Sequence, residues 1–126
     1  VGLFGSRHYV RTLSEADVDQ IVAMLNFDVP GSGEMVEVIG SFDLAKKVLD
    51  YGAANGIALT RGTPLEGASS DHAPFRAVDI PFLFFLADDL SRINSPADSL
   101  EFVKPELMGA TVALALGLLD ELAKEP

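Results

Sequence analysis

The sequence has no cysteine or tryptophan and contains only two histidines, His8 and His72. Without cysteine the chain can form neither a disulfide framework nor a thiolate metal site. Two imidazoles leave little material for a histidine-rich metal site or a catalytic triad. Cationic residues are also few, since 9 Lys and Arg stand against 19 Asp and Glu and give a formal net charge of −10. A chain of this charge repels nucleic-acid phosphates and anionic membranes, so neither is favoured as a partner.

Motifs that would assign a function directly are missing as well. There is no glycine-rich phosphate loop, no Walker-type lysine and no nucleophile elbow. No signal peptide is visible, and the longest apolar stretch is too short to span a bilayer. Apolar residues are nevertheless abundant, at 48% of 126 residues, which is enough for one real core. We predict a single domain over residues 1–126, and a chain that starts at Val1 is expected to be part of something longer.

Short apolar runs alternate with helical stripes along the chain. Strands are predicted near residues 21–28, 35–39, 57–60 and 80–86, and helices at 42–55 and 105–124. A shorter helix is expected at 7–13, capped by Ser6, and one or two helical turns at 71–78. Strands that alternate with helices indicate a layered α/β/α domain with a central mixed, largely parallel sheet of about four strands.

The run IVAMLNFDVPG at residues 21–31 is the most informative stretch. Its unbroken apolar part, closed by a Pro-Gly turn, predicts a central strand buried on both faces. Such a strand delivers Asp28 to the carboxyl edge of the sheet, where open α/β folds bind their ligands. A carboxylate there must be paired or bind a metal, because burying it alone is costly. The alternative is that Asp28 is an ordinary turn or cap acid.

Three polar loops follow predicted strands and would meet at one edge if those strands are parallel. They carry potential oxygen and nitrogen ligands for zinc or a related ion, namely Asp28, Asp71, His72, Asn94 and Asp98. Spacing alone leaves simpler alternatives open for two of these residues. His72 can be a structural histidine bonded to its loop, and Asp71 can be an Asx turn or a helix cap.

Four blocks resemble the M28 family of zinc-dependent aminopeptidases, to which glutaminyl cyclases are more distantly related. They are GLFGSRHY at residues 2–9, LNFDVPG at 25–31, SSDHAPF at 69–75 with IP at 80–81, and NSPADS at 94–99. The blocks occur in family order and resemble the carboxyl-terminal part of such an enzyme. The resemblance implies a zinc-exopeptidase-like fold, zinc as the family's metal and peptides as its substrates. It also implies secretion or a periplasmic location.

The resemblance assigns expected roles to individual residues. Asp28 corresponds to a zinc-ligating aspartate, and Ser70, Asp71 and His72 correspond to a block that orients ligands or substrate. Asn94 stands where the family has a zinc-ligating histidine, and Asp98 matches a later aspartate of the same motif.

No catalytic residue is predicted in this chain. In the family two consecutive glutamates, a general base and a zinc ligand, come directly before the block that starts here at Gly2. We therefore expect an incomplete centre that shows no peptidase activity alone, because hydrolysis needs a polarised water and a base. The alternative reading is a non-catalytic folding or association module. In either case the partner could be a second copy or a chain that supplies the missing half.

Overall fold

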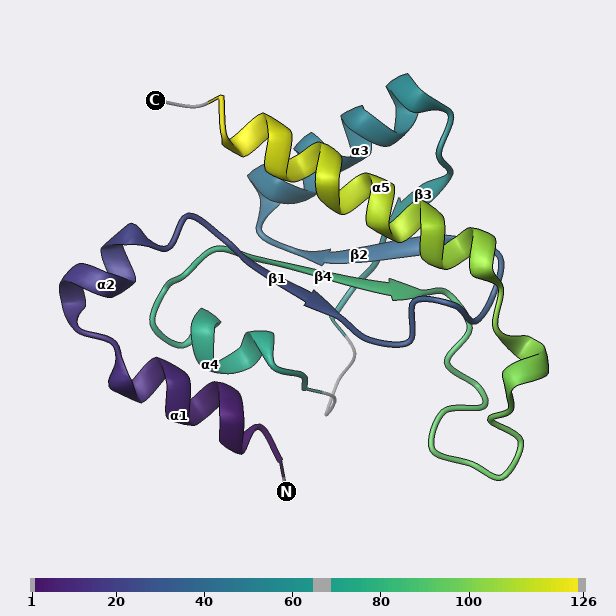
Figure 1. Ribbon diagram of the computed structural model, residues 1–126, viewed down its shortest axis with the longest axis horizontal. Coiled ribbons are helices and arrows are strands. Elements are labelled where there is room, and N and C mark those ends of the chain that lie inside the picture. Colours follow the sequence, from purple (N-terminus) through teal and green to yellow (C-terminus); the bar gives the residue numbers. More distant parts are fainter. Residues whose placement is uncertain (1, 65–68, 125–126) are drawn as a thin grey trace.

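A computed structural model of the chain describes residues 2–64 and 69–124, and these form a four-stranded mixed sheet (Figure 1). The strands lie in the order β1-β4-β2-β3. β1 pairs parallel to β4, β2 pairs parallel to β3, and β2 and β4 are antiparallel. The predicted mixed, largely parallel sheet is confirmed. The strand bounds are β1 (Met24–Phe27), β2 (Val36–Gly40), β3 (Leu59–Arg61) and β4 (Phe82–Ala87).

Helices cover both faces of this sheet, as a layered α/β/α domain requires (Figure 1). α3 (Phe42–Asn55) and α5 (Pro105–Leu122) pack against each other and over one face. α4 (His72–Arg76) lies against β1 and β4 on the other face, and α1 (Phe4–Thr12) packs on α4. α2 (Glu15–Gln20) and the 3-10 helix η1 (Leu100–Phe102) are short connecting elements. No helix in the described ranges is both long enough and apolar enough to cross a membrane.

The alternation of side chains along β4 explains why the sheet needs both helical layers. Leu83 and Phe85 are fully buried and belong to the main core with residues of α3 and α5. Phe82 and Phe84, one position out of phase, point to the opposite face, where the ring of His72 stacks on both. An apolar run of this kind, with no polar residue at every second position, predicts a strand that is covered on both faces.

The 21–28 run is not a central strand, and this prediction was wrong. β1 has a strand neighbour on one side only among the described residues, namely β4, and it forms an edge of the sheet. The ring of Phe27 is 45% exposed although it stacks on Phe85. The two central strands are β4 and β2. The apolar run indicates that both faces of the strand are partly covered. Whether the strand is central or at an edge depends instead on its pairing with strands distant in the sequence.

Two expected caps also differ from the structure. α1 begins earlier than predicted, at Phe4, and its N-cap is Leu3 rather than Ser6. Asp71 precedes α4 but makes no capping hydrogen bond with it. α2 begins with a complete capping box, in which Ser14 and Asp17 are bonded reciprocally. This box holds the pKa of Asp17 below its usual value, chiefly through the Ser14 hydroxyl.

Candidate functional site

Asp28 follows β1 directly and is held at the edge of the sheet where β1 and β4 both end. Its backbone N–H donates to the carbonyl of Phe85 at 3.1 Å. The next residue, Val29, has φ of 48°, which is unusual for a β-branched residue and costs roughly 1–3 kcal/mol. The carbonyl of Val29 accepts a hydrogen bond from Ala87 at 3.2 Å. The surrounding strands therefore enforce a strained turn immediately beyond this acid.

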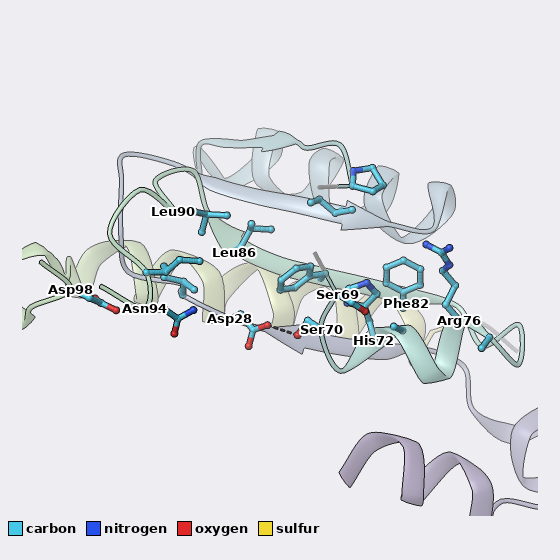
Figure 2. Close-up of a pocket in the computed structure, with 17 residues that line it drawn as sticks. Asp28, Ser69, Ser70, His72, Arg76, Phe82, Leu86, Leu90, Asn94 and Asp98 are labelled. Carbon is cyan, nitrogen blue, oxygen red and sulfur yellow. Dashed lines mark hydrogen bonds between the residues drawn. The ribbon is translucent and has the colours of Figure 1, made fainter. Parts of the chain in front are cut away.

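Two neutral side chains orient the Asp28 carboxylate. The Ser70 hydroxyl donates to Oδ2 of Asp28 in a short hydrogen bond, and Nδ2 of Asn26 lies 3.4 Å from the same oxygen (Figure 2). Asn26 is buried and also donates to the Ser70 oxygen at 2.9 Å. Asn26 and Asp28 share one face of the strand because they are two residues apart. This arrangement leaves the other carboxylate oxygen, Oδ1, without a hydrogen bond from either side chain.

Asp71 has a different role from its neighbour Ser70. Its Oδ1 accepts a hydrogen bond from the Ser6 hydroxyl at 2.7 Å, which ties α1 to the start of α4. Asp71 is exposed and is not among the residues that line the cavity described below. The structure therefore joins two of the sequence blocks through these side chains, and it does not bring Asp71 to Asp28 by a direct contact.

His72 lies flat on the sheet instead of bonding its own loop. Its ring stacks on Phe82 with centroids 4.7 Å apart and on Phe84 at 5.1 Å. Nδ1 is buried and has no hydrogen-bond partner in the described structure. Burial lowers the pKa of His72, and the nearby Arg76 guanidinium lowers it further, although Asp28 acts in the opposite direction. The imidazole is thus held in its neutral form near pH 7.

These residues border a cavity of about 990 Å³. Figure 2 shows Asp28 between two ends of this cavity, with His72, Phe82 and Arg76 at one end and Asn94 and Asp98 at the other. Apolar side chains form much of its floor and walls, and they include Ile39, Phe82, Phe84, Leu86, Leu90 and Ile93. An apolar cavity with a few convergent polar groups is typical of a small-molecule or side-chain binding site.

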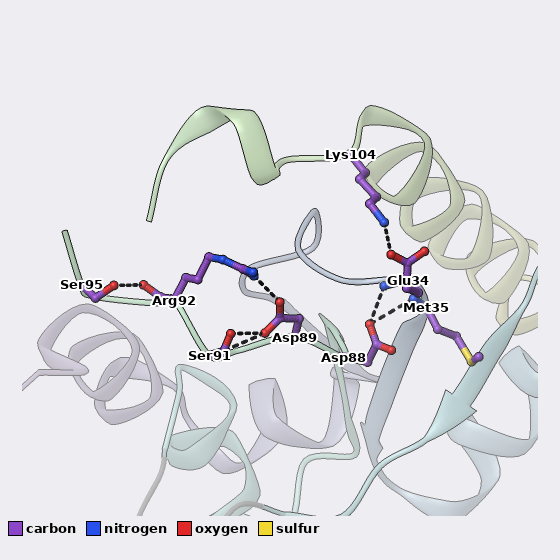
Figure 3. A network of polar contacts seen from close by, with 8 residues as sticks. All are labelled: Glu34, Met35, Asp88, Asp89, Ser91, Arg92, Ser95 and Lys104. Carbon is purple, nitrogen blue, oxygen red and sulfur yellow. Dashed lines mark hydrogen bonds and ion pairs between the residues drawn. The ribbon is translucent and has the colours of Figure 1, made fainter. Parts of the chain in front are cut away.

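Leu90, Ile93 and Asn94 lie in a loop whose start is held by polar contacts of Asp88 and Asp89 (Figure 3). Oδ1 of Asp88 accepts from the backbone N–H groups of Glu34 at 2.7 Å and of Met35 at 3.1 Å. These bonds lower the pKa of Asp88, the first being the larger cause. The left-handed conformation of Asn94, with φ of 56°, lies in this loop and suits an asparagine better than most residues.

A second group of contacts holds the same loop further along. Ser91 donates to Asp89 through its hydroxyl at 2.6 Å and its backbone at 2.9 Å, and Arg92 pairs with the same carboxylate (Figure 3). The pKa of Asp89 is lowered to about 2, mainly by the Ser91 hydroxyl. The guanidinium of Arg92 lies 4.2 Å from the ring centroid of Phe102. The loop is therefore supported from η1 as well as from its own turn.

The expected meeting of three loops at one edge is correct for two of them. β1 and β4 are parallel, so Asp28 and the loop with Asn94 and Asp98 meet at the edge where both strands end. β3 runs antiparallel to β4 through β2, and its end lies at the opposite edge. Ser70 still reaches Asp28, because Ser70 lies just before α4, which packs against β1 and β4.

Sequence reasoning missed Asn26 and the apolar lining of the cavity. The signal for Asn26 was available, since it is a lone amide in an apolar strand and stands two residues before Asp28. Phe82, Phe84 and Leu86 also show the period-two spacing of one strand face. The strained turn at Val29 left no signal, because a valine predicts ordinary extended backbone.

The donor set does not suffice for a zinc centre by itself. A catalytic zinc takes three protein ligands and a structural zinc takes four. Among residues 2–64 and 69–124 there is no group of three or more His, Asp or Glu side chains that could hold a metal ion. Asp28 lines the cavity with its Oδ2 already bonded by Ser70, while Asn94 offers only a neutral amide. The described residues can supply one carboxylate ligand of such a centre and the apolar cavity beside it.

Comparison with known proteins relates this site to a peptidase family. The sequence profile described as Peptidase family M28 matches residues 1–119. A probable leucine aminopeptidase of Arthroderma benhamiae is 32% identical over 133 residues, which cover 97% of this chain and 36% of that protein. This chain therefore spans about a third of the length of that relative.

Solved structures show the same fold relationship. A zinc aminopeptidase from Bacillus subtilis superposes with a TM-score of 0.80 at 24% identity, over 99% of this chain and 34% of that one. A glutaminyl cyclase from an Acidobacteriales bacterium superposes with a TM-score of 0.76 at 17% identity, over 94% and 45% of the two chains. The resemblance predicted from four sequence blocks is confirmed. The profile match covers nearly the whole chain, and we conclude that the chain belongs to peptidase family M28.

Proposed function

We propose that this chain forms part of an aminopeptidase-type site, in which the cavity beside Asp28 receives the amino-terminal residue of a peptide. The observation that carries the proposal is a carboxylate, held by Ser70, that lines an apolar cavity in a member of family M28. The cavity of about 990 Å³ has room for an amino-acid side chain and the adjoining backbone. Its lining favours an apolar side chain, because burying that surface is worth roughly 25 cal/mol per Å².

The residues of this chain would act by positioning. Ser70 and Asn26 hold Oδ2 of Asp28, which orients the carboxylate beside the cavity that it lines, and neither side chain bonds Oδ1. The neutral His72 presents an apolar ring face and lies on the aromatic floor, which suits an uncharged substrate side chain. In family M28 the metal is zinc, and it would supply a polarised water. The described residues provide no complete set of zinc ligands, so we derive no hydrolytic step from this chain alone.

Two measurements on the purified chain test this proposal. We expect L-leucinamide to bind in an NMR titration and L-glutamate amide, with its charged side chain, to bind far more weakly. With zinc added, leucine-p-nitroanilide should not be hydrolysed. Zinc-dependent turnover by the 126-residue chain would show that its centre is complete and would overturn the second expectation.

A pair of charge substitutions locates the binding site. Ile93 lines the cavity and is 37% exposed, so Ile93→Arg should fold and should abolish leucinamide binding. Leu100 lies on η1 and is 84% exposed without lining the cavity, so Leu100→Arg is the matched control and should bind normally. Equal binding by both variants would mean that the ligand does not enter this cavity.

A further inference from the structure

Arg76 is the only lysine or arginine among the described residues that line the cavity beside Asp28. It lies on α4 four residues after His72, so both side chains project from one side of that helix, about one turn apart. This side faces the sheet, because the ring of His72 stacks on aromatic rings of β4. Figure 2 shows the Arg76 side chain near Phe82, at the end of the cavity opposite Asp98. A cation therefore stands at one end of a largely apolar cavity.

Charge is distributed unevenly along this cavity. Asp28 and Asp98 are the acids among its described lining residues, and both lie away from the Arg76 end. His72 responds to charges of both signs, because the Arg76 guanidinium lowers its pKa and the Asp28 carboxylate raises it. No acid within residues 2–64 and 69–124 forms a salt bridge with Arg76, whereas several other cations of the chain pair with acids. The cavity thus has a negative group near its centre and a positive group at one end.

The floor of the cavity sets the distance between these two groups. Alternate residues of β4 from Phe82 to Leu86 lie on one face of the strand and line the cavity. Arg76 is near Phe82, whereas Asp28 lies beside the end of β4, where its backbone N–H donates to a carbonyl of that strand. Four residue steps of a strand correspond to roughly 13 Å. An extended peptide advances by about 3.3–3.6 Å per residue, so a peptide of three or four residues spans this length.

We propose that Arg76 binds the terminal carboxylate of a short peptide, three or four residues long, whose amino-terminal residue lies beside Asp28. The inference rests on the proposed function, which places the amino-terminal residue there. A guanidinium suits this partner, because its planar donors can bind both oxygens of a carboxylate in parallel. The aromatic and aliphatic floor between the two charges suits the uncharged middle of such a peptide. The site would therefore select peptides with a free carboxyl terminus over peptides whose terminus is blocked.

An NMR titration of the 126-residue chain with Leu-Gly-Gly and with its amide, Leu-Gly-Gly-NH2, tests the proposal. The readout is the ratio of the two dissociation constants, because a net charge of −10 favours the more cationic amide in every variant. Arg76 is exposed, and an exposed ion pair contributes at most about fivefold in affinity. We expect Arg76→Gln to shift the ratio by about that factor against the free carboxylate, and Arg76→Lys to shift it less.

Arg11→Gln is the matched control, because it removes the same charge from an exposed position on α1 that does not line the cavity. This variant should leave the ratio unchanged. Circular dichroism would verify that the variants at these two exposed positions are folded. If Arg76→Gln and Arg11→Gln give the same ratio, Arg76 does not bind the carboxylate and the proposal is overturned.

A third peptide identifies which carboxylate is bound. Leu-Gly-Glu-NH2 carries its only carboxylate on a side chain, and we expect it to bind equally to Arg76→Gln and Arg11→Gln. If this peptide loses affinity in Arg76→Gln while Leu-Gly-Gly does not, Arg76 recognises an acidic side chain, and the assignment to the terminal carboxylate is wrong.

L-leucinamide separates this inference from the proposed function, because it is too short to reach from Asp28 to Arg76. It should bind equally to Arg76→Gln and Arg11→Gln. If leucinamide binds and the tripeptide ratio does not depend on Arg76, this inference is overturned and the proposed function stands. If leucinamide itself does not bind, the proposed function fails and this inference fails with it.

Discussion

Two glycines on α5 offer a sharp test of how this helix packs. Gly109 and Gly117 lie eight residues apart, and spacing alone suggests one small-residue stripe with Ala113 that allows close approach. The structure separates them. A side chain at Gly109 would meet nothing within 4 Å, whereas a Cβ at Gly117 would lie 2.4–2.5 Å from three ring carbons of Tyr51. Close approach is therefore required at Gly117 alone, and it is to α3 rather than to the sheet.

The expected magnitudes follow from this difference. Either Gly→Ala substitution favours the helix by roughly 0.8–1.0 kcal/mol. At Gly109 nothing opposes this gain, so Gly109→Ala should stabilise the chain by about that amount. At Gly117 the new methyl group lies well inside the contact distance of roughly 3.5–4.0 Å, and displacing the Tyr51 ring should cost about 1–3 kcal/mol. Because the propensity gain is common to both, the two variants should differ by about 1–3 kcal/mol in the free energy of unfolding.

Urea unfolding followed by far-UV circular dichroism measures this difference, provided that both variants retain the wild-type dependence on denaturant. The protein should be dilute, so that self-association does not contribute. Gly117→Ala combined with Tyr51→Leu should recover part of the loss, since the smaller side chain removes the ring carbons. If the two single variants shift stability equally, the close contact between α3 and α5 does not exist as described.

Three further predictions concern the candidate site. The folded-state pKa of His72 is lowered, so protonation favours the unfolded chain and stability should fall below about pH 6.5. His72→Gln should remove this dependence in urea midpoints compared at neutral and mildly acidic pH, and His8→Gln should keep it. Ser70→Ala removes the hydroxyl that donates to Asp28 and should lower the free energy of unfolding by about 1–3 kcal/mol. If Ser70→Ala is no less stable than Ser69→Ala, the hydroxyl of Ser70 does not have this role. Asp88→Ala loses two backbone hydrogen bonds and should cost about 1–2 kcal/mol in thermal unfolding. Asp88→Asn keeps one acceptor oxygen and should therefore lose less stability than Asp88→Ala. An unchanged melting temperature in Asp88→Ala would count against the hydrogen bonds from Glu34 and Met35.

Local signals predicted the helices well where they were complete. The helix expected at residues 42–55 is α3 (Phe42–Asn55), and its stop at Gly56 has the left-handed conformation, with φ of 68°. The same kind of signal failed at Ser6, whose hydroxyl bonds to Asp71 across 65 positions of sequence instead of capping its own helix. A serine hydroxyl can bond its own helix or another group, and a distant hydrogen-bond partner can decide between the two.

The candidate site was predictable in its members more than in its contacts. Asp28 was expected at a sheet edge because it follows an apolar strand, and this location is confirmed. Its hydrogen bond with Ser70 joins residues 42 positions apart, and no spacing rule predicts such a contact. The role expected for Asp28 as a zinc ligand stays a prediction, as do the roles of His72 and Asn94.

The amino-acid sequence by itself determined the α/β class, the approximate positions of the strands and main helices, and the family. These depend on periodicity, caps and short motifs, which act over a few residues. Only the tertiary structure decided that β1 is an edge strand, that His72 stacks on Phe82 and Phe84, and which side of α5 stays uncovered. α5 is apolar around most of its circumference between residues 107 and 119, so periodicity could not identify its buried face. Strand order and helix packing arise from contacts between distant segments. The free energies of those contacts cannot be predicted from any local sequence pattern.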